Sequence, residues 1–303
     1  MTDDHPSIPE IPLAAPPEVV VDLLTETGEG TLWDDREQVL YWLDIPPGRL
    51  YRFNPETGAN DLVYQHDAQI GGTTLQDDGS LLLFCSFGKI LRLDAATGKT
   101  NTIVGSIEAE QDTRFNDVEA DPKGGVFCGT MPSKNHEARL YHLARDGSLT
   151  LLYDDIGLSN GIGFSPDTKT MYHVDTNKRL LYTFAYDKET GNLTNRSILV
   201  SKWSGEGYPD GMTVDHEGNL WVARWDGRAV YRYTPDGNAA GRVRFPVRKV
   251  SDIAFGGPGF ADAFVSTAAP NGRSETEGEN AGSIFRFKPL VMGKAPFRSR
   301  IGL

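Results

Sequence analysis

The sequence predicts an all-β protein: a single six-bladed β-propeller domain at residues 18–303, preceded by a flexible N-terminal tail at residues 1–17. Two short patterns each occur six times in alternation, and successive copies of the first begin 40–54 residues apart. We find no long amphipathic helix between them. Units of this length that consist of short strands and turns are typical of propeller blades.

The first pattern is a short strand with aromatic or branched apolar residues, followed by a turn. Its first copy is Tyr51-Arg52-Phe53, which leads into Asn54-Pro55. Aromatic and branched residues favour strands, whereas Asn, Asp, Gly and Pro favour turns. The six copies begin at Tyr51, Leu91, Tyr141, Phe184, Tyr231 and Phe285.

The second pattern is a turn that leads into an apolar strand, as Asp77-Asp78-Gly79 leads into Leu81-Leu82-Leu83-Phe84. Its six strands begin at Val39, Leu81, Val126, Met171, Leu220 and Ala263. Six blades of about four strands would use the whole chain after the tail. Two β-sandwiches would not account for six matched units. We expect the early strand at residues 19–24 to pair with the last blade, because this leaves no open sheet edge.

Composition limits the partners and the compartment. The net charge of −12 and the isoelectric point near 5.0 argue against nucleic acid and anionic membranes as partners. No apolar run approaches the roughly 18 residues of a membrane span. Cys85 and Cys128 lie in apolar, strand-like runs, where buried free thiols are usual. With only two cysteines and no signal peptide, we expect a cytoplasmic protein that is a monomer or a weak dimer.

Polar residues that differ between blades are the candidates for function where they stand just before an inner strand, at the mouth of the central channel. Asn160-Gly161 in blade four aligns with Asp210-Gly211 in blade five, and Asn116 in blade three and Glu29 in blade one fit the same frame. Alone, Pro-Asp-Gly and Asn-Gly are ordinary turn sequences. Their shared position in four blades favours a site.

These four side chains offer only oxygen atoms to a cation, from two carboxylates and two carboxamides. Oxygen donors of this kind suit one hard divalent cation: calcium, magnesium or manganese, with zinc as a further possibility. Coordination positions left open would take water or substrate.

Nine short segments follow one another at spacings that fit the blades: Gly28-Glu29-Gly30 with Trp33, Tyr41–Ile45, Arg114–Asp117, Gly129–Met131, Ser159–Gly161, Tyr172–Thr176, Pro209–Gly211, Phe255–Pro258 and Gly282–Phe285. Together they resemble the SMP-30/gluconolactonase/LRE family, which includes regucalcin and bacterial sugar lactonases. The resemblance covers about residues 19–299 and implies a six-bladed propeller.

The resemblance also implies roles for particular residues. Glu29, Asn160 and Asp210 would bind the metal, Asp210 would also be the catalytic acid or base, and Arg114 and Asn116 would contact the substrate. Some members place a substrate-contacting Glu shortly after the Gly-Thr-Met segment. Here Lys134 lies near that place, which would change the polarity and the preferred sugar. Asp252 is a further polar residue that could enter the channel.

The implied function is hydrolysis of a sugar aldonolactone, such as gluconolactone or a pentonolactone, to the aldonic acid. The metal would polarise the ester carbonyl and Asp210 would transfer the proton. Three alternatives stay open: a promiscuous esterase or phosphotriesterase with the same metal site, a calcium-binding regulatory protein without turnover, and a propeller that only binds partners. The last two do not require Glu29, Asn160 and Asp210 to converge.

Overall fold

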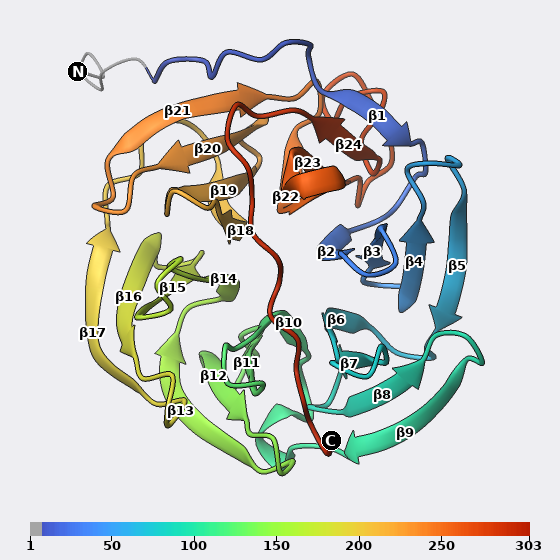
Figure 1. Ribbon diagram of the computed structural model, residues 1–303, viewed down its shortest axis with the longest axis vertical. Coiled ribbons are helices and arrows are strands. Elements are labelled where there is room, and N and C mark those ends of the chain that lie inside the picture. Colours follow the sequence, from blue (N-terminus) through green and yellow to red (C-terminus); the bar gives the residue numbers. More distant parts are fainter. Residues whose placement is uncertain (1–7) are drawn as a thin grey trace.

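The computed structural model describes residues 8–303, which form six four-stranded antiparallel sheets around a central axis (Figure 1). The predicted six-bladed β-propeller is confirmed. The innermost strands are β2 (Gly28–Asp34), β6 (Ile70–Leu75), β10 (Phe115–Ala120), β14 (Ser159–Phe164), β18 (Tyr208–Val214) and β22 (Lys249–Gly256). The second strands are β3 (Val39–Asp44), β7 (Leu81–Cys85), β11 (Val126–Thr130), β15 (Thr170–Asp175), β19 (Leu220–Trp225) and β23 (Asp262–Ala268).

The two outer strands of each blade complete the ring. The third strands are β4 (Arg49–Phe53), β8 (Ile90–Asp94), β12 (Ala138–Leu143), β16 (Leu180–Tyr186), β20 (Ala229–Tyr233) and β24 (Ile284–Phe287). The outermost strands are β5 (Asn60–Gln65), β9 (Lys99–Val104), β13 (Leu149–Ile156), β17 (Leu193–Val200), β21 (Ala239–Arg244) and, in the last blade, β1 (Glu18–Val21). Two short 3₁₀ turns, η1 (Glu108–Glu110) and η2 (Pro258–Phe260), are the helical elements of residues 8–303.

The two sequence patterns correspond to fixed positions in each blade. The turn-and-apolar-strand pattern forms the second strand, and the aromatic pattern forms the third strand. The predicted ring closure is also confirmed, because β1 pairs with β24, with Val19 opposite Phe285. The last sheet therefore contains strands from both ends of the chain, so that all six blades have four strands.

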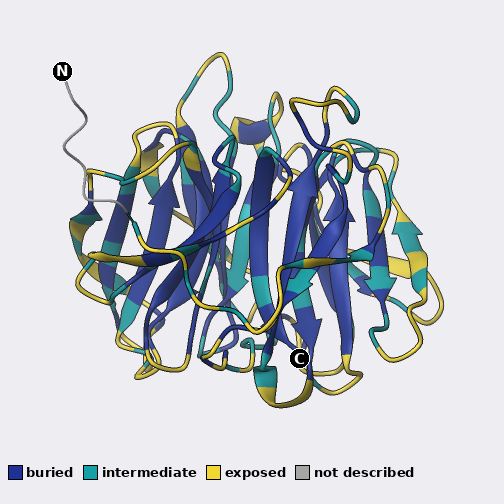
Figure 2. Cartoon of the chain, turned by 90° about the horizontal axis from the view of Figure 1, so that it is seen from above, coloured by how far each residue is buried: buried dark blue, intermediate teal, exposed yellow. Residues whose placement is uncertain are grey.

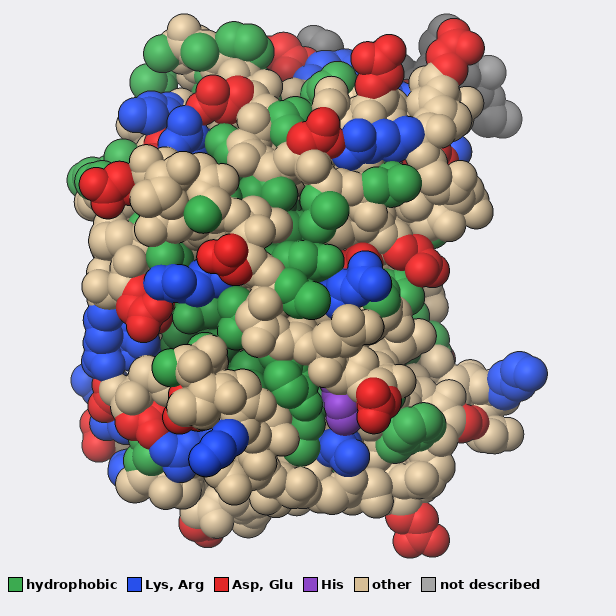
Figure 3. All heavy atoms as spheres, turned by 90° about the vertical axis from the view of Figure 1, so that its right-hand side faces the viewer, with side chains coloured by type: hydrophobic (Ala, Val, Ile, Leu, Met, Phe, Trp, Pro, Cys, Tyr) green, Lys and Arg blue, Asp and Glu red, His purple; other side chains and the backbone are tan. Residues whose placement is uncertain are grey.

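Burial decreases from the inside of the ring to the outside (Figure 2). Every residue of β7 is buried, as an apolar strand covered on both faces by neighbouring blades must be. The outermost β9 is mostly exposed. On the side of the molecule shown in Figure 3, acidic and basic side chains are interspersed rather than grouped by sign.

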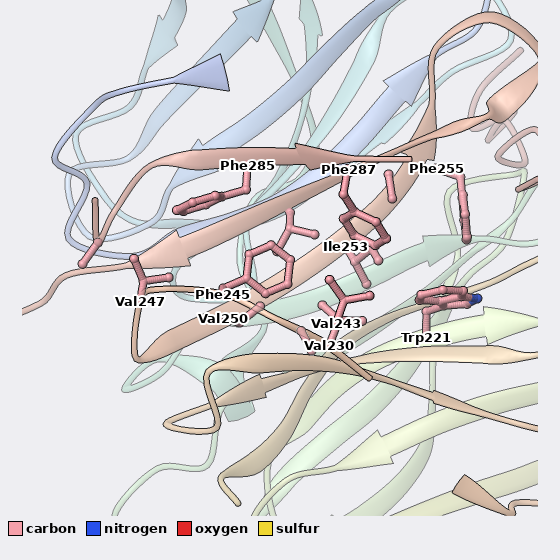
Figure 4. Packing of buried hydrophobic residues seen from close by; sticks show 14 of the residues in the cluster. Trp221, Val230, Val243, Phe245, Val247, Val250, Ile253, Phe255, Phe285 and Phe287 are labelled. Carbon is pink, nitrogen blue, oxygen red and sulfur yellow. The ribbon is translucent and has the colours of Figure 1, made fainter. Parts of the chain in front are cut away.

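The core consists of apolar layers between adjacent blades. Between blades five and six, Trp221 packs edge-on against Phe255 at 5.8 Å between ring centroids, and Phe245 packs against Phe285 at 5.5 Å (Figure 4). Such contacts fix neighbouring blades relative to each other, because each ring contributes both buried area and a preferred geometry. The inner strands are thereby held at defined positions around the axis.

The C-terminal segment after β24, residues 289–303, crosses the axis and covers the end of the channel where the inner strands finish (Figure 1). We call it the C-terminal strap. It contacts every blade: through Met292 with His216, Gly293 with Phe260, Phe297 with Phe164, Arg298 with Asp34, Ser299 with Leu75 and Arg300 with Gly124. The opposite end, where the inner strands begin, is the end left for a substrate to enter.

Residues before β1 lie along the outer strand of blade five. The backbone of Ile11 donates to the carbonyl of Arg242 at 2.8 Å, and the Glu10 carboxylate accepts from the side chains of Arg242 and Arg244 at 2.8 and 2.9 Å. This pairing holds part of the segment for which the sequence predicted a flexible tail. Residues 1–7, the remainder of that prediction, lie outside the described residues. Within residues 8–303 there is no helix of the length and apolarity that would cross a bilayer.

Candidate active site

The inner strands share an irregularity near their first residues. In blades three, four and five, two consecutive residues leave the ladder between the inner and second strands, after one pair in blades three and four and after two pairs in blade five. The first of these two is Asn116, Asn160 or Asp210. A β-bulge bends the strand and turns a side chain away from its regular direction, which is common beside active sites. The bulges therefore place three of the predicted residues at equivalent positions around the channel mouth.

The fourth predicted position needs a correction. Glu29 still pairs with Leu43 in the ladder, and the residues that leave it are Gly30 and Thr31. The register thus shows that Gly30, and not Glu29, is the blade-one equivalent of Asn116, Asn160 and Asp210. Gly30 has a φ of 59°, a conformation that favours glycine, and a Cβ there would lie 2.9 Å from a Leu43 methyl group. Glu29 stands one residue earlier on β2.

All five predicted site residues nevertheless line one cavity, of about 460 Å³, at the open end of the channel. Glu29, Asn160 and Asp210 are 4–5% exposed, so their side chains are buried in the protein and open only to this space. The lining comprises Thr27, Glu29, Ile45, Arg114, Asn116, Met131, Leu158, Asn160, Thr176, Asn177, Tyr208, Asp210 and Trp225. The structure therefore brings together the five predicted site residues, of which the first and last, Glu29 and Asp210, are 181 positions apart in the chain.

A chain of hydrogen bonds runs across blades three, four and five at the wall of the cavity. Arg114 Nη1 donates to Asn116 Oδ1 at 2.6 Å, and Asn116 Nδ2 donates to Asn160 Oδ1 at 2.5 Å. Asn160 Nδ2 then donates to Thr176 Oγ1 at 2.7 Å, and the Thr176 hydroxyl donates to the Pro209 carbonyl at 2.7 Å. Three blades are thus joined through the side chains of the site itself.

The two carboxylates of the site, Glu29 and Asp210, have few neighbouring groups that would stabilise their negative charge. Burial, followed by the charges of Asp210, Asp117 and Asp252, raises the pKa of Glu29 well above its usual range. Burial and the charges of Asp117 and Asp252 likewise raise the pKa of Asp210, although Arg114 acts in the opposite direction. Within residues 8–303, neither Glu29 nor Asp210 forms a salt bridge. A bound cation would relieve this repulsion.

The donor set fits a divalent cation of the hard type. Glu29, Asn160 and Asp210 supply carboxylate and amide oxygens to one cavity, which are the ligands that calcium and magnesium prefer. No cluster of three or more His, Cys, Asp or Glu side chains arranged for an ion occurs in residues 8–303. The predicted set has two carboxylates and an amide, so it is a mixed site that leaves positions for water or substrate.

Below the site, a second and smaller cavity of about 90 Å³ follows the axis towards the C-terminal strap. Asp252 lines it, as the sequence suggested, and its carboxylate accepts from the backbone and hydroxyl of Thr31, both at 2.8 Å. Burial raises the pKa of Asp252 to about 6 and that of Glu119 to about 7. Lys294 of the strap faces the same space, and burial lowers its pKa. The channel is thus rich in carboxylates along its length.

Sequence reasoning missed Thr176, and the structure places Lys134 outside the cavity. Thr176 lies directly after β15, in a segment that carried the family resemblance, but its position alone gave no sign of contacts to two blades. Lys134 is exposed and does not line the cavity, although Met131, three residues earlier, does. Tyr208 and Trp225 also line the cavity, because Tyr208 precedes Pro209 and Trp225 ends β19.

Comparisons with known proteins agree with the predicted family and fold. Residues 27–269 match the family model described as SMP-30/Gluconolactonase/LRE-like region. The chain is 43% identical to pentonolactonase XacC of Haloferax volcanii, over 94% of this chain and 98% of that protein. It is 32% identical to 6-deoxy-6-sulfogluconolactonase of Pseudomonas putida, over 88% of this chain and 93% of that protein.

A solved structure is similar over the whole propeller. The calcium-binding protein regucalcin of Agrobacterium tumefaciens superimposes with a TM-score of 0.87 and 26% sequence identity, and the match covers 97% of this chain and all of that one. The family that the nine segments resembled is therefore the right one. The chain is a member of the SMP-30/gluconolactonase/LRE-like family.

Proposed function

We propose that the protein hydrolyses a sugar aldonolactone to the aldonic acid, with one divalent cation held by Glu29, Asn160 and Asp210. The observation that carries the proposal is that these three residues, with Arg114 and Asn116, line the same cavity. Two relatives that match over most of their length are named as lactonases of a pentonolactone and a sulfogluconolactone. Gluconolactone and pentonolactones are accordingly the first substrates to test.

When bound, a divalent cation supplies Lewis acidity to an ester carbonyl and charge stabilisation to the oxyanion that forms. The protein's own contribution centres on Asp210. Its carboxylate is buried, lines the cavity and accepts no hydrogen bond from residues 8–303, so an oxygen not used by the cation can accept a proton from the attacking water. The same carboxyl group would return that proton to the ring oxygen as the lactone C–O bond breaks.

Arg114 and Asn116 divide the work of positioning. One guanidinium nitrogen of Arg114 is engaged with Asn116 and with the Phe115 carbonyl at 2.8 Å, which leaves its other N–H groups for sugar hydroxyls. Asn116 donates to Asn160 and to the Ser159 carbonyl at 2.8 Å, so both of its N–H bonds are used. We infer that Arg114 makes the main substrate contact and that Asn116 mainly orients its neighbours.

The remaining wall is suited to the carbon face of a sugar ring. Ile45, Met131 and Leu158 give an apolar lining, and Trp225 and Tyr208 add aromatic surfaces near the mouth. Amphipathic aromatic rings pack against apolar faces and keep a polar edge towards water. The sugar hydroxyls would then face Arg114 and the carboxylate side of the cavity.

The test is proton release from a panel of hexono- and pentonolactones, measured with a pH indicator against a blank without protein, since these esters also hydrolyse spontaneously. Turnover that depends on added calcium, magnesium or manganese and stops with a chelator is the expected result. Metal binding without any acceleration of lactone opening would instead favour the second candidate, a calcium-binding protein without turnover, which the description of the Agrobacterium relative brings into view.

A further inference from the structure

Thr176 occupies a junction between two blades at the wall of the site. It follows directly on β15 of blade four, is 8% exposed and lines the same cavity as Glu29. Its oxygen accepts from Asn160 Nδ2 at 2.7 Å and its hydroxyl donates to the Pro209 carbonyl at 2.7 Å. Pro209 directly precedes Asp210. Thr176 therefore touches one proposed metal ligand and the residue next to another.

The direction of these hydrogen bonds is fixed by chemistry. A hydroxyl carries one hydrogen, and the Pro209 carbonyl can only accept, so the Thr176 hydrogen points to Pro209. A lone pair of Thr176 must then face Asn160, and only the NH₂ group of that amide can bond to it. The amide oxygen of Asn160 is consequently turned to the other side, towards the cavity and Asn116.

The far end of the hydrogen-bond chain imposes the same orientation. A guanidinium can only donate, so Arg114 requires the oxygen of Asn116 on its side. The NH₂ group of Asn116 is then directed at the Asn160 oxygen and at the Ser159 carbonyl. The chain thus begins at a group that only donates and ends at a group that only accepts, and both amides between them have one satisfied orientation.

We propose that Thr176 is a positioning residue that fixes the amide of Asn160, so that its oxygen and not its NH₂ group is presented to the cation. This inference rests on the metal site of the proposed function. Without the Thr176 oxygen, the Asn160 NH₂ group has no partner on that side, and only the hydrogen bond from Asn116 still holds the amide in this orientation. The Pro209 carbonyl, one residue before Asp210, loses its hydrogen-bond donor at the same time.

The first test is metal affinity, measured by isothermal titration calorimetry on the full chain after removal of metal with a chelator. For Thr176→Val, Kd for calcium, magnesium or manganese should rise by about 10- to 100-fold, the usual loss when an outer partner of a metal ligand is removed. Thr176→Ser, which keeps the hydroxyl, should bind as tightly as the unmodified protein. Equal affinity of Thr176→Val and the unmodified protein would overturn the inference.

Thr73→Val is the matched control. Thr73 is also buried and its hydroxyl also donates to a carbonyl, that of Leu82 at 2.9 Å, but it lines the axial cavity and not the site. Its substitution should leave Kd unchanged, which separates loss of a buried hydroxyl from loss of the Asn160 contact. A loss of affinity in Thr73→Val equal to that in Thr176→Val would mean a general effect on the fold and would overturn the inference.

A second pair of variants isolates the orientation of the amide. In Asn160→Asp the two side-chain oxygens are equivalent, so no orientation needs to be fixed, and the lone pair of Thr176 faces an oxygen. Adding Thr176→Val to this variant should leave Kd unchanged or lower it. A 10- to 100-fold loss in both backgrounds would show that Thr176 acts through strand spacing alone, against the inference. If the unmodified protein binds none of the three ions, the proposed metal site is itself wrong, and this inference falls with it.

Discussion

Both ends of the axial channel carry buried carboxylates, but the two ends treat them differently. At the strap end, Asp34 ends an inner strand, and Asp121 and Asp215 directly follow inner strands. All three accept hydrogen bonds from the turns beside them. Asp215, for example, accepts from the Asn219 backbone at 2.8 Å and from Trp221 Nε1 at 2.9 Å. These carboxylates occur in blades one, three and five and are engaged in holding the β-turns.

At the open end, the carboxylates of Glu29 and Asp210 do not repeat and are hardly engaged. Glu29 accepts from the Gly30 backbone at 3.3 Å, and Asp210 accepts no hydrogen bond from residues 8–303. Satisfied buried charges stabilise a fold, whereas unsatisfied ones cost free energy and persist where a ligand compensates them. Pairing, more than burial, therefore distinguishes the carboxylates of the turns from the two carboxylates of the candidate site.

The largest expected effect tests this division directly. Asp210→Asn should lower kcat for lactone hydrolysis by about 10²- to 10⁴-fold, the usual contribution of a general acid or base, and weaken metal binding as well. Because the substitution removes a buried, repelled charge, the metal-free protein should unfold at the same or a higher temperature. Turnover close to that of the unmodified protein would exclude Asp210 as the proton carrier.

Asp215→Asn is the counterpart at the strap end. The NH₂ group of Asn would face donors from Asn219 and Trp221, and the free energy of unfolding should fall by about 1–3 kcal/mol. The kcat of the folded protein should not change. Chemical denaturation and steady-state kinetics should show that Asp210→Asn loses activity but not stability, and that Asp215→Asn loses stability but not activity. The same loss in both variants would contradict the comparison.

The next effect concerns the strap. Arg298 is partly buried and pairs with Asp34 and Asp35, both at 2.7 Å. Arg298→Ala should reduce the free energy of unfolding by about 3 kcal/mol, because the Asp34 charge stays buried without its partner. Arg36→Ala removes an exposed pair with Asp77 and should cost less than about 1 kcal/mol.

Neither Arg298→Ala nor Arg36→Ala should alter kcat/KM, since both residues lie at the end of the channel away from the site. Denaturant titration gives the free energies, and lactone hydrolysis below the unfolding temperature gives the kinetics. A loss of activity in folded Arg298→Ala would show that the two ends of the channel are coupled.

A smaller effect is expected from pH. The raised pKa values of Asp252, about 6, and Glu119, about 7, mean that the folded protein holds these protons more tightly than the unfolded chain. Their contribution is most favourable below the ordinary pKa of roughly 4 and is lost as pH rises to about 7. Lys294 on the strap opposes the shift of Glu119, and the Thr31 hydrogen bonds oppose that of Asp252.

The metal-free protein should therefore show a Tm that falls between pH 5 and pH 7, and a divalent cation at the open end should reduce the fall. Differential scanning calorimetry with and without a chelator measures it. Glu119→Gln should flatten the curve. A Tm that rises over this range in the metal-free protein would mean that these carboxylates are compensated by other groups.

The fold was predictable because each blade repeats the same physical requirement. A second strand buried on both faces needs an apolar run such as Leu81–Cys85, and a tight turn before it needs Asp or Gly. The N-terminal segment was less readable, since its Pro-rich and acidic composition is typical of a mobile tail. The packing of Ile11 and Leu13 against the layer between blades five and six, together with the hydrogen bonds to Arg242 and Arg244, explains why it lies on β21.

The site was predictable in its members and less so in its geometry. Asn116, Asn160 and Asp210 could be aligned because the polar residue and the apolar residues after it recur together. The offset of Glu29 depends on which residues leave the ladder of β2, and the side-chain pattern does not reveal that. Thr176 donates to a carbonyl of another blade, a contact that becomes visible only once blades four and five are placed side by side.

The smallest expected effect refines the comparison at the open end. Lys134 is a non-repeating polar residue three positions after Met131, yet it is exposed and outside the cavity. Lys134→Ala should change kcat/KM by about twofold at most, since a surface substitution contributes within about 0.5 kcal/mol. Arg114→Lys, inside the cavity, should lower it far more, because Lys cannot hold Asn116 and a sugar hydroxyl at fixed angles. Kinetics with two lactones that differ at one hydroxyl measure both. If Lys134→Ala alters the preference between the two lactones as strongly as Arg114→Lys does, then specificity extends beyond the cavity wall to the exposed loop after β11.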